Sequence, residues 1–230
     1  MNNEYLAAVC DSPMVLFPGQ DWPRSLDGLG NGFEYRRNLV LKYAWAIPSN
    51  EAIARIAMHS PLIEVGAGSG YWASLIADAG ADIIATDIEP PEATYYPVAR
   101  MEARKAVRAH PDRTLLMVWP PYDMPMAYRA ISAYRGSRFI YVGEDSGGCT
   151  GDARLWDSIR LNWEHEDLVD IPRFYTLSDL LFVFHRTGNH RYRHGQRCSR
   201  CHKFLRFSPV DFGRACDPCI EKQMEYPGRG

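Results

Sequence analysis

The sequence contains no run of about 20 apolar residues, which is the length that a membrane-spanning helix needs, and no internal repeat or low-complexity segment. Its first residues, MNNEYLAAVC, include neither a basic segment nor a long apolar one, so nothing there is typical of a secretory signal. These absences argue against a membrane or exported protein. We therefore expect a soluble, cytoplasmic protein with no membrane partner.

The chain also has little net charge: 26 Lys and Arg residues stand against 28 Asp and Glu, which gives −2. The charges are unevenly spread, because seven basic residues and no acidic residue lie between Arg186 and Arg206. A locally cationic tail of this kind suits contact with nucleic acid phosphates. With 230 residues, 46% of them hydrophobic, the chain can form one large domain and one small module.

The order of the patterns divides the chain into three parts. Residues 1–48 are predicted to form an arm, irregular over 1–36 where Pro, Gly, Asp and Asn are frequent, that ends in a helix-like stretch. Residues 49–187 alternate between strand and helix patterns, and apolar strands such as TLLMV are typical of a sheet covered on both faces. This pattern predicts a doubly wound, mostly parallel α/β fold. Residues 188–230 form the small module.

The expected elements of the α/β domain follow from apolar periodicity and from capping residues. Helices are predicted at 50–59, 71–79, 103–110, 125–134 and 152–163, and strands at 62–65, 82–87, 114–119 and 138–143. Two more strands, at 166–171 and 180–186, are too close together for a helical crossover. We expect these two strands to form an antiparallel hairpin at the edge of the sheet.

A glycine-rich turn, IEVGAGSGYW, follows the first strand of this domain. Glycines let a backbone turn tightly and approach a ligand closely, and the next helix offers free N–H groups to it. A dinucleotide fingerprint, G-x-G-x-x-G, would need a third glycine at position 71, where Tyr71 stands. The pattern therefore weakens a nicotinamide hypothesis. A turn that binds nothing is the other alternative.

The pattern Glu64-x-Gly66-x-Gly68-x-Gly70 resembles motif I of the class I methyltransferases that use S-adenosylmethionine. The resemblance covers about residues 50–186 and implies a seven-stranded sheet whose first loop contacts the amino-acid end of the cofactor. Asp87, with Glu89 as a nearby substitute, would accept hydrogen bonds from the ribose hydroxyls, and VARMEA looks like a short third strand followed by the acidic residue that faces the adenine. The cofactor-binding residues that the resemblance implies are Glu64, Gly66, Ala67, Gly68, Gly70, Tyr71, Asp87, Ile88, Met101 and Glu102. Ile88 and Met101 would enclose the adenine ring.

A second motif, WPPY, ends the strand at 114–119 and is similar to the Asp/Asn/Ser-Pro-Pro-aromatic motif of methyltransferases that act on exocyclic amino groups. Its first residue, Trp119, carries an indole that only donates, so the side-chain acceptor for the amine is missing. Pro-Pro-Tyr would still fix a rigid turn, and Tyr122 would stack on a planar substrate. A simple strand exit is the alternative. Glu144, after the next strand, would accept a proton from the nucleophile or orient it.

Two C-x-x-C pairs, Cys198/Cys201 and Cys216/Cys219, are separated by fourteen residues in the basic tail. Two tight turns that each present two thiolates can form a closed tetrahedral Zn²⁺ site, and the arrangement resembles a zinc ribbon. Disulfides are disfavoured without a secretory signal, and CSRCH as a haem attachment would leave Cys216 and Cys219 unexplained. His202 is an alternative ligand.

Together these patterns predict a methyltransferase that uses S-adenosylmethionine and carries a structural Zn²⁺ in a C-terminal ribbon. The methyl acceptor is unidentified; the PPY residues and the cationic tail favour an amine of a nucleic acid or nucleotide, while a small metabolite or a protein side chain stays open. The alternative is a non-catalytic Rossmann-like protein that recruits a partner through its zinc ribbon. The lack of an acceptor at Trp119 supports this alternative.

Overall fold

The computed structural model describes residues 2–21 and 32–187, and the zinc ribbon predicted at 188–230 lies outside them. The helices of the described part are α1 (Glu4–Val9), α2 (Gly32–Lys42), α3 (Asn50–Ala57), α4 (Tyr71–Asp78), α5 (Ala103–Ala109), α6 (Met126–Ala133) and α7 (Ala153–Asn162). Its strands are β1 (Val15–Leu16), β2 (Leu62–Val65), β3 (Ile83–Asp87), β4 (Val98–Arg100), β5 (Thr114–Val118), β6 (Arg138–Gly143), β7 (Trp163–Asp170), β8 (Arg173–Phe174) and β9 (Leu180–Arg186). The five helices and the strands predicted over 49–187 are all present, with ends that differ by a few residues.

Seven strands form one sheet in the order β4-β3-β2-β5-β6-β9-β7. Every pair is parallel except the two pairs made by β9, which runs antiparallel to both β6 and β7. The α/β fold with a mostly parallel seven-stranded sheet is thus confirmed. The predicted antiparallel pairing of the last two strands is also confirmed. Of these two strands, β7 lies at the edge of the sheet and β9 lies between β7 and β6.

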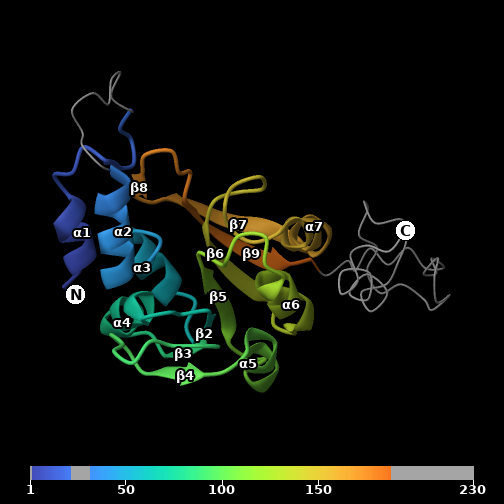
Figure 1. Cartoon of the computed structure of the whole chain (residues 1–230). Helices are drawn as coiled ribbons and strands as arrows, with labels where there is room; N and C mark the ends of the chain where they lie inside the picture. The colour runs from blue at the N-terminus through green and yellow to red at the C-terminus, as the bar shows by residue number, and fades with distance from the viewer. Residues whose placement is uncertain (1, 22–31, 188–230) are drawn as a thin grey trace, which may run out of the picture.

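Two hydrophobic clusters fill the space between the sheet and its helices. One cluster joins the sheet to α1, α3 and α4, and the other joins it to α5, α6 and α7; Figure 1 shows these helix groups on opposite sides of the sheet. Both faces of strand β5 are buried, since Leu115 belongs to one cluster and its neighbour Leu116 to the other. The apolar run TLLMV therefore marks a strand that is buried on both faces.

Side chains next to the helices set where several of them begin. Ser49, Glu102 and Asp152 accept hydrogen bonds from backbone N–H groups in the first turns of α3, α5 and α7 respectively. Helix α4 begins differently, after Gly70 in the left-handed conformation with φ of +71°. These starts match the predicted helices, because the N-cap signals are local in sequence.

The N-terminal arm is more ordered than its composition indicated. Residues 1–36 were expected to be irregular, but α1 begins after a cap from Asn3, and β1 pairs antiparallel with β8. The Asn3 amide also donates to Pro48 O at 2.8 Å, and the Tyr5 ring stacks on Tyr43 with 4.9 Å between centroids. The expectation was wrong because tertiary contacts stabilise a helix of six residues that has no periodicity of its own.

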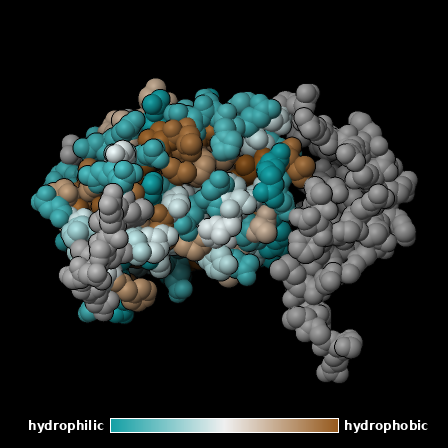
Figure 2. Space-filling view, turned by 90° about the horizontal axis from the view of Figure 1, so that it is seen from above, coloured by the Kyte–Doolittle hydropathy of each residue, from teal (hydrophilic) through white to brown (hydrophobic). Residues whose placement is uncertain are grey.

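The surface of the described residues mixes hydrophilic areas with smaller hydrophobic ones (Figure 2). Exposed large hydrophobic side chains include Phe33, Leu41, Trp45, Ile88, Tyr95, Tyr122 and Met124. Within residues 2–21 and 32–187, no helix is both long enough and apolar enough to cross a membrane.

Candidate functional site

The carboxyl ends of the parallel strands meet at one edge of the sheet, and the predicted site residues lie there. The glycine-rich loop follows β2, Asp87 ends β3, Trp119 follows β5 and Glu144 follows β6. The strand order reverses between β2 and β5, since β2 pairs with β3 on one side and with β5 on the other. Ligands of open α/β sheets bind at such a switch point.

The glycine-rich loop has the conformation that its sequence requires. Gly66, Gly68 and Gly70 have φ of +74°, +53° and +71°, a region that residues with a Cβ atom rarely adopt. A Cβ on Gly70 would come within 2.9 Å of Val98 Cγ2, whereas a Cβ on Gly68 would meet no atom of the described residues within 4 Å. No side chain of the described residues covers the backbone at Gly68, so a ligand could approach it closely.

Asp87 is tied directly to this loop. Its Oδ2 accepts from the Gly68 N–H at 2.9 Å and its Oδ1 accepts from the Glu89 N–H at 2.8 Å. A carboxylate has about four lone-pair positions, so both oxygens can still accept hydroxyl donors. The structure thus brings together the loop and the acid that were predicted to bind the two ends of one nucleoside cofactor.

Glu64 lies beneath the loop as a buried carboxyl group with an unsatisfied oxygen. The residue is 1% exposed, and its Oε2 has no hydrogen-bond partner among the described residues. Burial, followed by the charge of Asp87, raises the pKa of Glu64 to about 8. A buried acid without a partner is costly, so a cationic group bound at this loop would relieve that cost.

S-adenosylmethionine fits these features. Its ammonium group matches the orphaned Glu64 carboxyl, its ribose hydroxyls match Asp87, and the open space at Gly68 admits a ligand close to the backbone. Tyr71 begins α4, and its hydroxyl accepts from the Tyr5 N–H at 2.9 Å, so this residue links the loop to α1 instead of facing outward.

The residues predicted to contact the adenine ring follow strands β3 and β4. Ile88 is exposed and directly follows Asp87 at the end of β3, and Met101 directly follows β4, where its N–H donates to Asp87 O at 2.8 Å. The Glu102 carboxylate accepts from the Lys105 N–H as the cap of α5, and no helix occupies residues 88–97. The contacts of these three side chains with an adenine ring stay a prediction.

Replacing Asp87 by Ala is expected to weaken binding of S-adenosylhomocysteine by about 1–3 kcal/mol, the range for a lost hydrogen bond to a charged group. The variant removes the acceptor for the ribose and releases the Gly68 N–H. Titration calorimetry measures the change. Asp78→Ala, at the exposed end of α4, is the matched control. Equal affinities for both variants would remove Asp87 from the site.

The turn that was predicted to bind the methyl acceptor begins at Trp119. This residue has a left-handed backbone with φ of +51°, its N–H donates to Val142 O at 2.7 Å, and its ring stacks on that of Trp45 with 5.1 Å between centroids. Tyr122, on the turn that follows, is 66% exposed, so a planar molecule can reach its ring. Trp119 and Tyr122 are thus at opposite ends of one short turn.

Glu144 is held by two loops. Its Oε2 accepts from the Cys149 N–H at 2.7 Å and its Oε1 accepts from the Ser178 N–H at 2.9 Å. Burial alone would raise its pKa, but the hydrogen bond with the Cys149 side chain, together with these two backbone bonds, outweighs burial and holds the pKa below the usual range. The same neighbourhood acts oppositely on Cys149, because burial and then Glu144 raise the pKa of that thiol to about 12. Cys149 is therefore a protonated, weakly reactive thiol, and the role of Glu144 as a base stays a prediction.

The sequence analysis missed two charged residues that lie next to Trp119. Asp179, next to the first residue of β9, accepts from Trp119 Nε1 at 2.7 Å, and the Arg36 guanidinium of α2 lies 5.1 Å from the Trp119 ring centroid. The sequence offered only a weak signal for Asp179, an acid directly before an apolar strand. Arg36 offered none, because α2 has no buried residue to show a periodic face.

The segment that joins α2 to α3 connects the two halves of the site. Ser69 of the glycine-rich loop donates its hydroxyl to Tyr43 O at 2.6 Å, and the Trp72 indole donates to Ala46 O at 3.2 Å. Trp45 lies between those two positions and stacks on Trp119. One stretch of four residues thus contacts both the predicted cofactor loop and the predicted acceptor turn.

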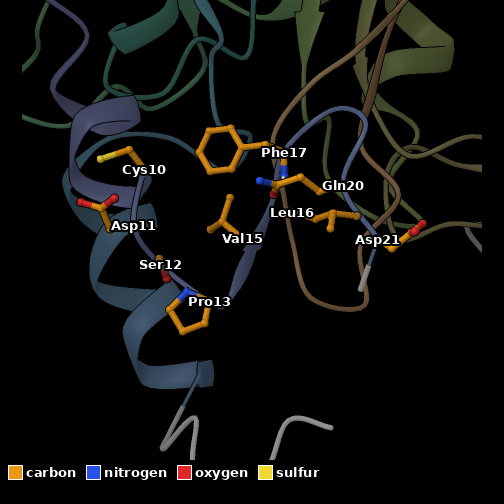
Figure 3. Close-up of a pocket in the computed structure, with 9 residues that line it drawn as sticks. All are labelled: Cys10, Asp11, Ser12, Pro13, Val15, Leu16, Phe17, Gln20 and Asp21. Atoms are coloured by element: carbon orange, nitrogen blue, oxygen red, sulfur yellow. The ribbon is translucent and has the colours of Figure 1, made fainter. Parts of the chain in front are cut away.

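A separate cavity of about 340 Å³ lies between the end of α1 and the segment that follows β1 (Figure 3). Its lining residues are Cys10, Asp11, Ser12, Pro13, Val15, Leu16, Phe17, Gln20 and Asp21. None of the predicted site residues is among them. The cavity therefore belongs to the N-terminal arm, apart from the site at the sheet edge.

No protein-family model matches the sequence, and no curated protein matches it. Among solved structures, the chain is similar to the 23S rRNA methyltransferase ErmE, with 17% identity and a TM-score of 0.39 over 62% of this chain and 70% of that one. It is also similar to magnesium protoporphyrin IX methyltransferase (ChlM) from Synechocystis PCC 6803 with bound SAM, with 9% identity and a TM-score of 0.44 over 72% and 86% of the two chains.

A third similar structure is a SAM-dependent methyltransferase from Bacteroides fragilis in complex with S-adenosyl-L-homocysteine, with 13% identity and a TM-score of 0.39. That match covers 79% of this chain and 94% of the other. Similarities of this size assign neither a family nor an activity to the chain. Its function has to be inferred from its own residues.

Proposed function

We propose that this protein is a methyltransferase that uses S-adenosylmethionine and acts on an amine of a nucleic acid or nucleotide. The observation that carries the proposal is the glycine-rich loop at the switch point of the sheet. There the Gly68 N–H is bound to Asp87, and the unpartnered carboxyl of Glu64 lies beneath the loop. The amine as acceptor is supported by the Pro120-Pro121-Tyr122 turn after β5 and by the basic residues between Arg186 and Arg206.

When bound, S-adenosylmethionine would supply a methyl group on a sulfonium that is already activated for in-line transfer. The protein would then contribute mainly by positioning, which accounts for a large part of the rate in such reactions. Glu64, Asp87 and the loop backbone would hold the cofactor. The turn that contains Tyr122 would hold the acceptor against the carboxyl end of β5, where the exposed tyrosine ring can stack on it.

The test of this function compares two glycines that share a left-handed backbone and open space at the Cβ position, one in the loop and one after α4. Gly68 and Gly80 both have positive φ, and a Cβ on either would meet no described atom within 4 Å. Replacing either by Ala is expected to cost about 1–2 kcal/mol of stability through backbone strain. Only Gly68→Ala is expected to weaken binding of S-adenosylhomocysteine, by about tenfold or more, or 1.4 kcal/mol.

Calorimetric titration with S-adenosylmethionine, S-adenosylhomocysteine and NAD measures this pair and separates the alternatives. Equal losses of affinity in the Gly68 and Gly80 variants would show that the loop does not contact the ligand. A well-folded wild-type protein that binds neither sulfur compound would favour the non-catalytic binding protein. Tighter binding of NAD would revive the nicotinamide hypothesis.

We further propose that residues 188–230 form a zinc ribbon in which Cys198, Cys201, Cys216 and Cys219 bind one structural Zn²⁺. The support is the spacing of the two C-x-x-C pairs. In the described residues no cluster of three or more His, Cys, Asp or Glu could hold a metal. The basic residues around the cysteines would contact phosphates of a nucleic acid partner.

A further inference from the structure

The turn after β5 lacks a side-chain acceptor at its first position, and the structure shows what that position does instead. Trp119 donates its indole N–H to Asp179 Oδ1 at 2.7 Å, across 60 positions of sequence. Asp179 is 1% exposed. Because β9 runs antiparallel to β6, the residue before β9 lies at the same edge of the sheet as the end of β6, where Gly143 pairs with Leu180.

The Trp119 backbone needs such a contact. A φ of +51° is uncommon for a residue with a bulky side chain and costs on the order of 1–2 kcal/mol. Four contacts hold it there: the N–H bond to Val142 O, the stack on Trp45, the Arg36 guanidinium over the ring and the indole bond to Asp179. Of these, only the bond to Asp179 fixes the polar edge of the indole.

The conformation of Trp119 in turn determines where the next residues go. Pro120 O accepts from the Gly151 N–H at 3.0 Å, and the Asp123 N–H donates to Gly151 O at 2.8 Å, so both ends of the turn after Trp119 are bound to Gly151, in the loop before α7. The direction in which this turn leaves β5 is set by the left-handed backbone of Trp119. Loss of the indole bond to Asp179 would remove one of the contacts that hold Trp119 in this conformation.

We propose that Asp179 is a positioning residue of the methyl-transfer site: by accepting the Trp119 indole N–H, it fixes the turn that holds the acceptor amine. This inference rests on the proposed function. Asp179 does not contact the acceptor. It acts on the turn through Trp119, whose indole cannot itself accept a hydrogen bond from the amine.

The charges around Asp179 make the contact sensitive to pH. Burial and, to a smaller extent, the Glu144 carboxylate raise its pKa to about 7 against the lowering effects of Trp119, Arg36 and Arg173. A hydrogen bond to an ionised carboxylate is stronger than one to a neutral group. The bond from Trp119 therefore strengthens as the pH rises through about 7.

The test compares Asp179→Ala, which removes the acceptor, with Asp179→Asn, which keeps an oxygen in its place but cannot ionise. Labelled S-adenosylmethionine and a cell extract, as a mixed pool of acceptors, provide the transfer assay. Asp179→Ala is expected to lower the transfer rate by about 10²-fold, the effect of a small misplacement of reacting groups. Asp179→Asn is expected to restore most of the rate and to abolish a pH dependence that rises through about 7 in the wild type.

Two further measurements separate this inference from the proposed function. Affinity for S-adenosylhomocysteine is expected to be unchanged in both variants, because Asp179 contacts no residue of the glycine-rich loop in any hydrogen bond of the described part. Tryptophan fluorescence of the ligand-free protein is expected to titrate near pH 7 in the wild type but not in Asp179→Asn. Asp170→Asn, an exposed acid opposite Leu180 in β7, is the control.

A transfer rate in Asp179→Ala equal to that of the wild type would overturn the inference and leave the proposed function intact. So would equally low rates in Asp179→Ala and Asp179→Asn, since hydrogen-bond acceptance would then not be the role of this residue. A wild-type protein that fails to bind S-adenosylhomocysteine would overturn the proposed function itself, whatever the fluorescence shows.

Discussion

Glu64→Gln is expected to stabilise the ligand-free protein at pH 8 by up to about 4 kcal/mol and, at the same time, to weaken its binding of S-adenosylmethionine. The stability gain follows from the pKa of Glu64, which burial and then Asp87 raise from 4.5 to about 8. Above pH 4.5 the unfolded chain has released this proton while the folded chain keeps it. Wild-type stability should therefore fall as the pH rises from 4.5 to about 8.

The affinity for S-adenosylmethionine should fall because the amide oxygen of Gln is uncharged and would accept only a weaker hydrogen bond from the ammonium group of this compound. Chemical denaturation across this pH range and calorimetric titration give the two values. Glu92→Gln, which changes an exposed acid between β3 and β4, serves as the control and should leave both values close to those of the wild type. If Glu64→Gln showed the same fall in stability with pH as the wild type, the buried carboxyl would not be the titrating group.

Zinc is expected at one atom per chain, and it should be lost when Cys198 or Cys219 is replaced by Ser. Apparent free energies of about 10–16 kcal/mol accompany metal binding in small zinc modules, so the loss should be nearly complete. Elemental analysis of the purified protein measures it. Cys10→Ser and Cys149→Ser are matched controls, because both residues are free cysteines in the described part of the chain and should leave the zinc content unchanged.

Removal of the zinc should not affect the cofactor site, since Glu64, the glycine-rich loop and Asp87 all belong to the sheet. Binding of S-adenosylhomocysteine in the Cys198→Ser variant should therefore match that of the wild type. A wild-type protein without metal, or a zinc content that survives both tail substitutions, would contradict the ribbon.

Those parts of the site that depend on short stretches of sequence could be predicted. The strand β2, the turn with three left-handed glycines and helix α4 follow one another within seventeen residues, and local backbone preferences fix them. Asp87 was predictable because it ends the next strand of a parallel sheet. The bond from Gly68 to Asp87 then follows from the register of β2 and β3.

Contacts between distant residues were not predictable in the same way. Trp119 was identified as a motif residue without an acceptor, but its partner Asp179 directly precedes the antiparallel strand β9, whose place beside β6 is set by the sheet. Likewise, Glu144 was predicted to be a base from its position alone. The backbone groups of Cys149 and Ser178 that lower its pKa come from two loops whose course no local pattern describes.

The antiparallel direction of β9 also determines where the C-terminal tail begins relative to the predicted site. Arg186, the last residue of β9, lies near the start of β6, so the described chain ends at the opposite edge of the sheet from the site. Strand β6 has six residues, and its length of about 20 Å separates the two edges. Ten residues lie between Thr187 and Cys198, and a fully extended chain of that length spans at most about 35 Å. A zinc module on such a tether could reach the site of its own chain, so a nucleic acid bound to the module would be presented there at a raised effective concentration.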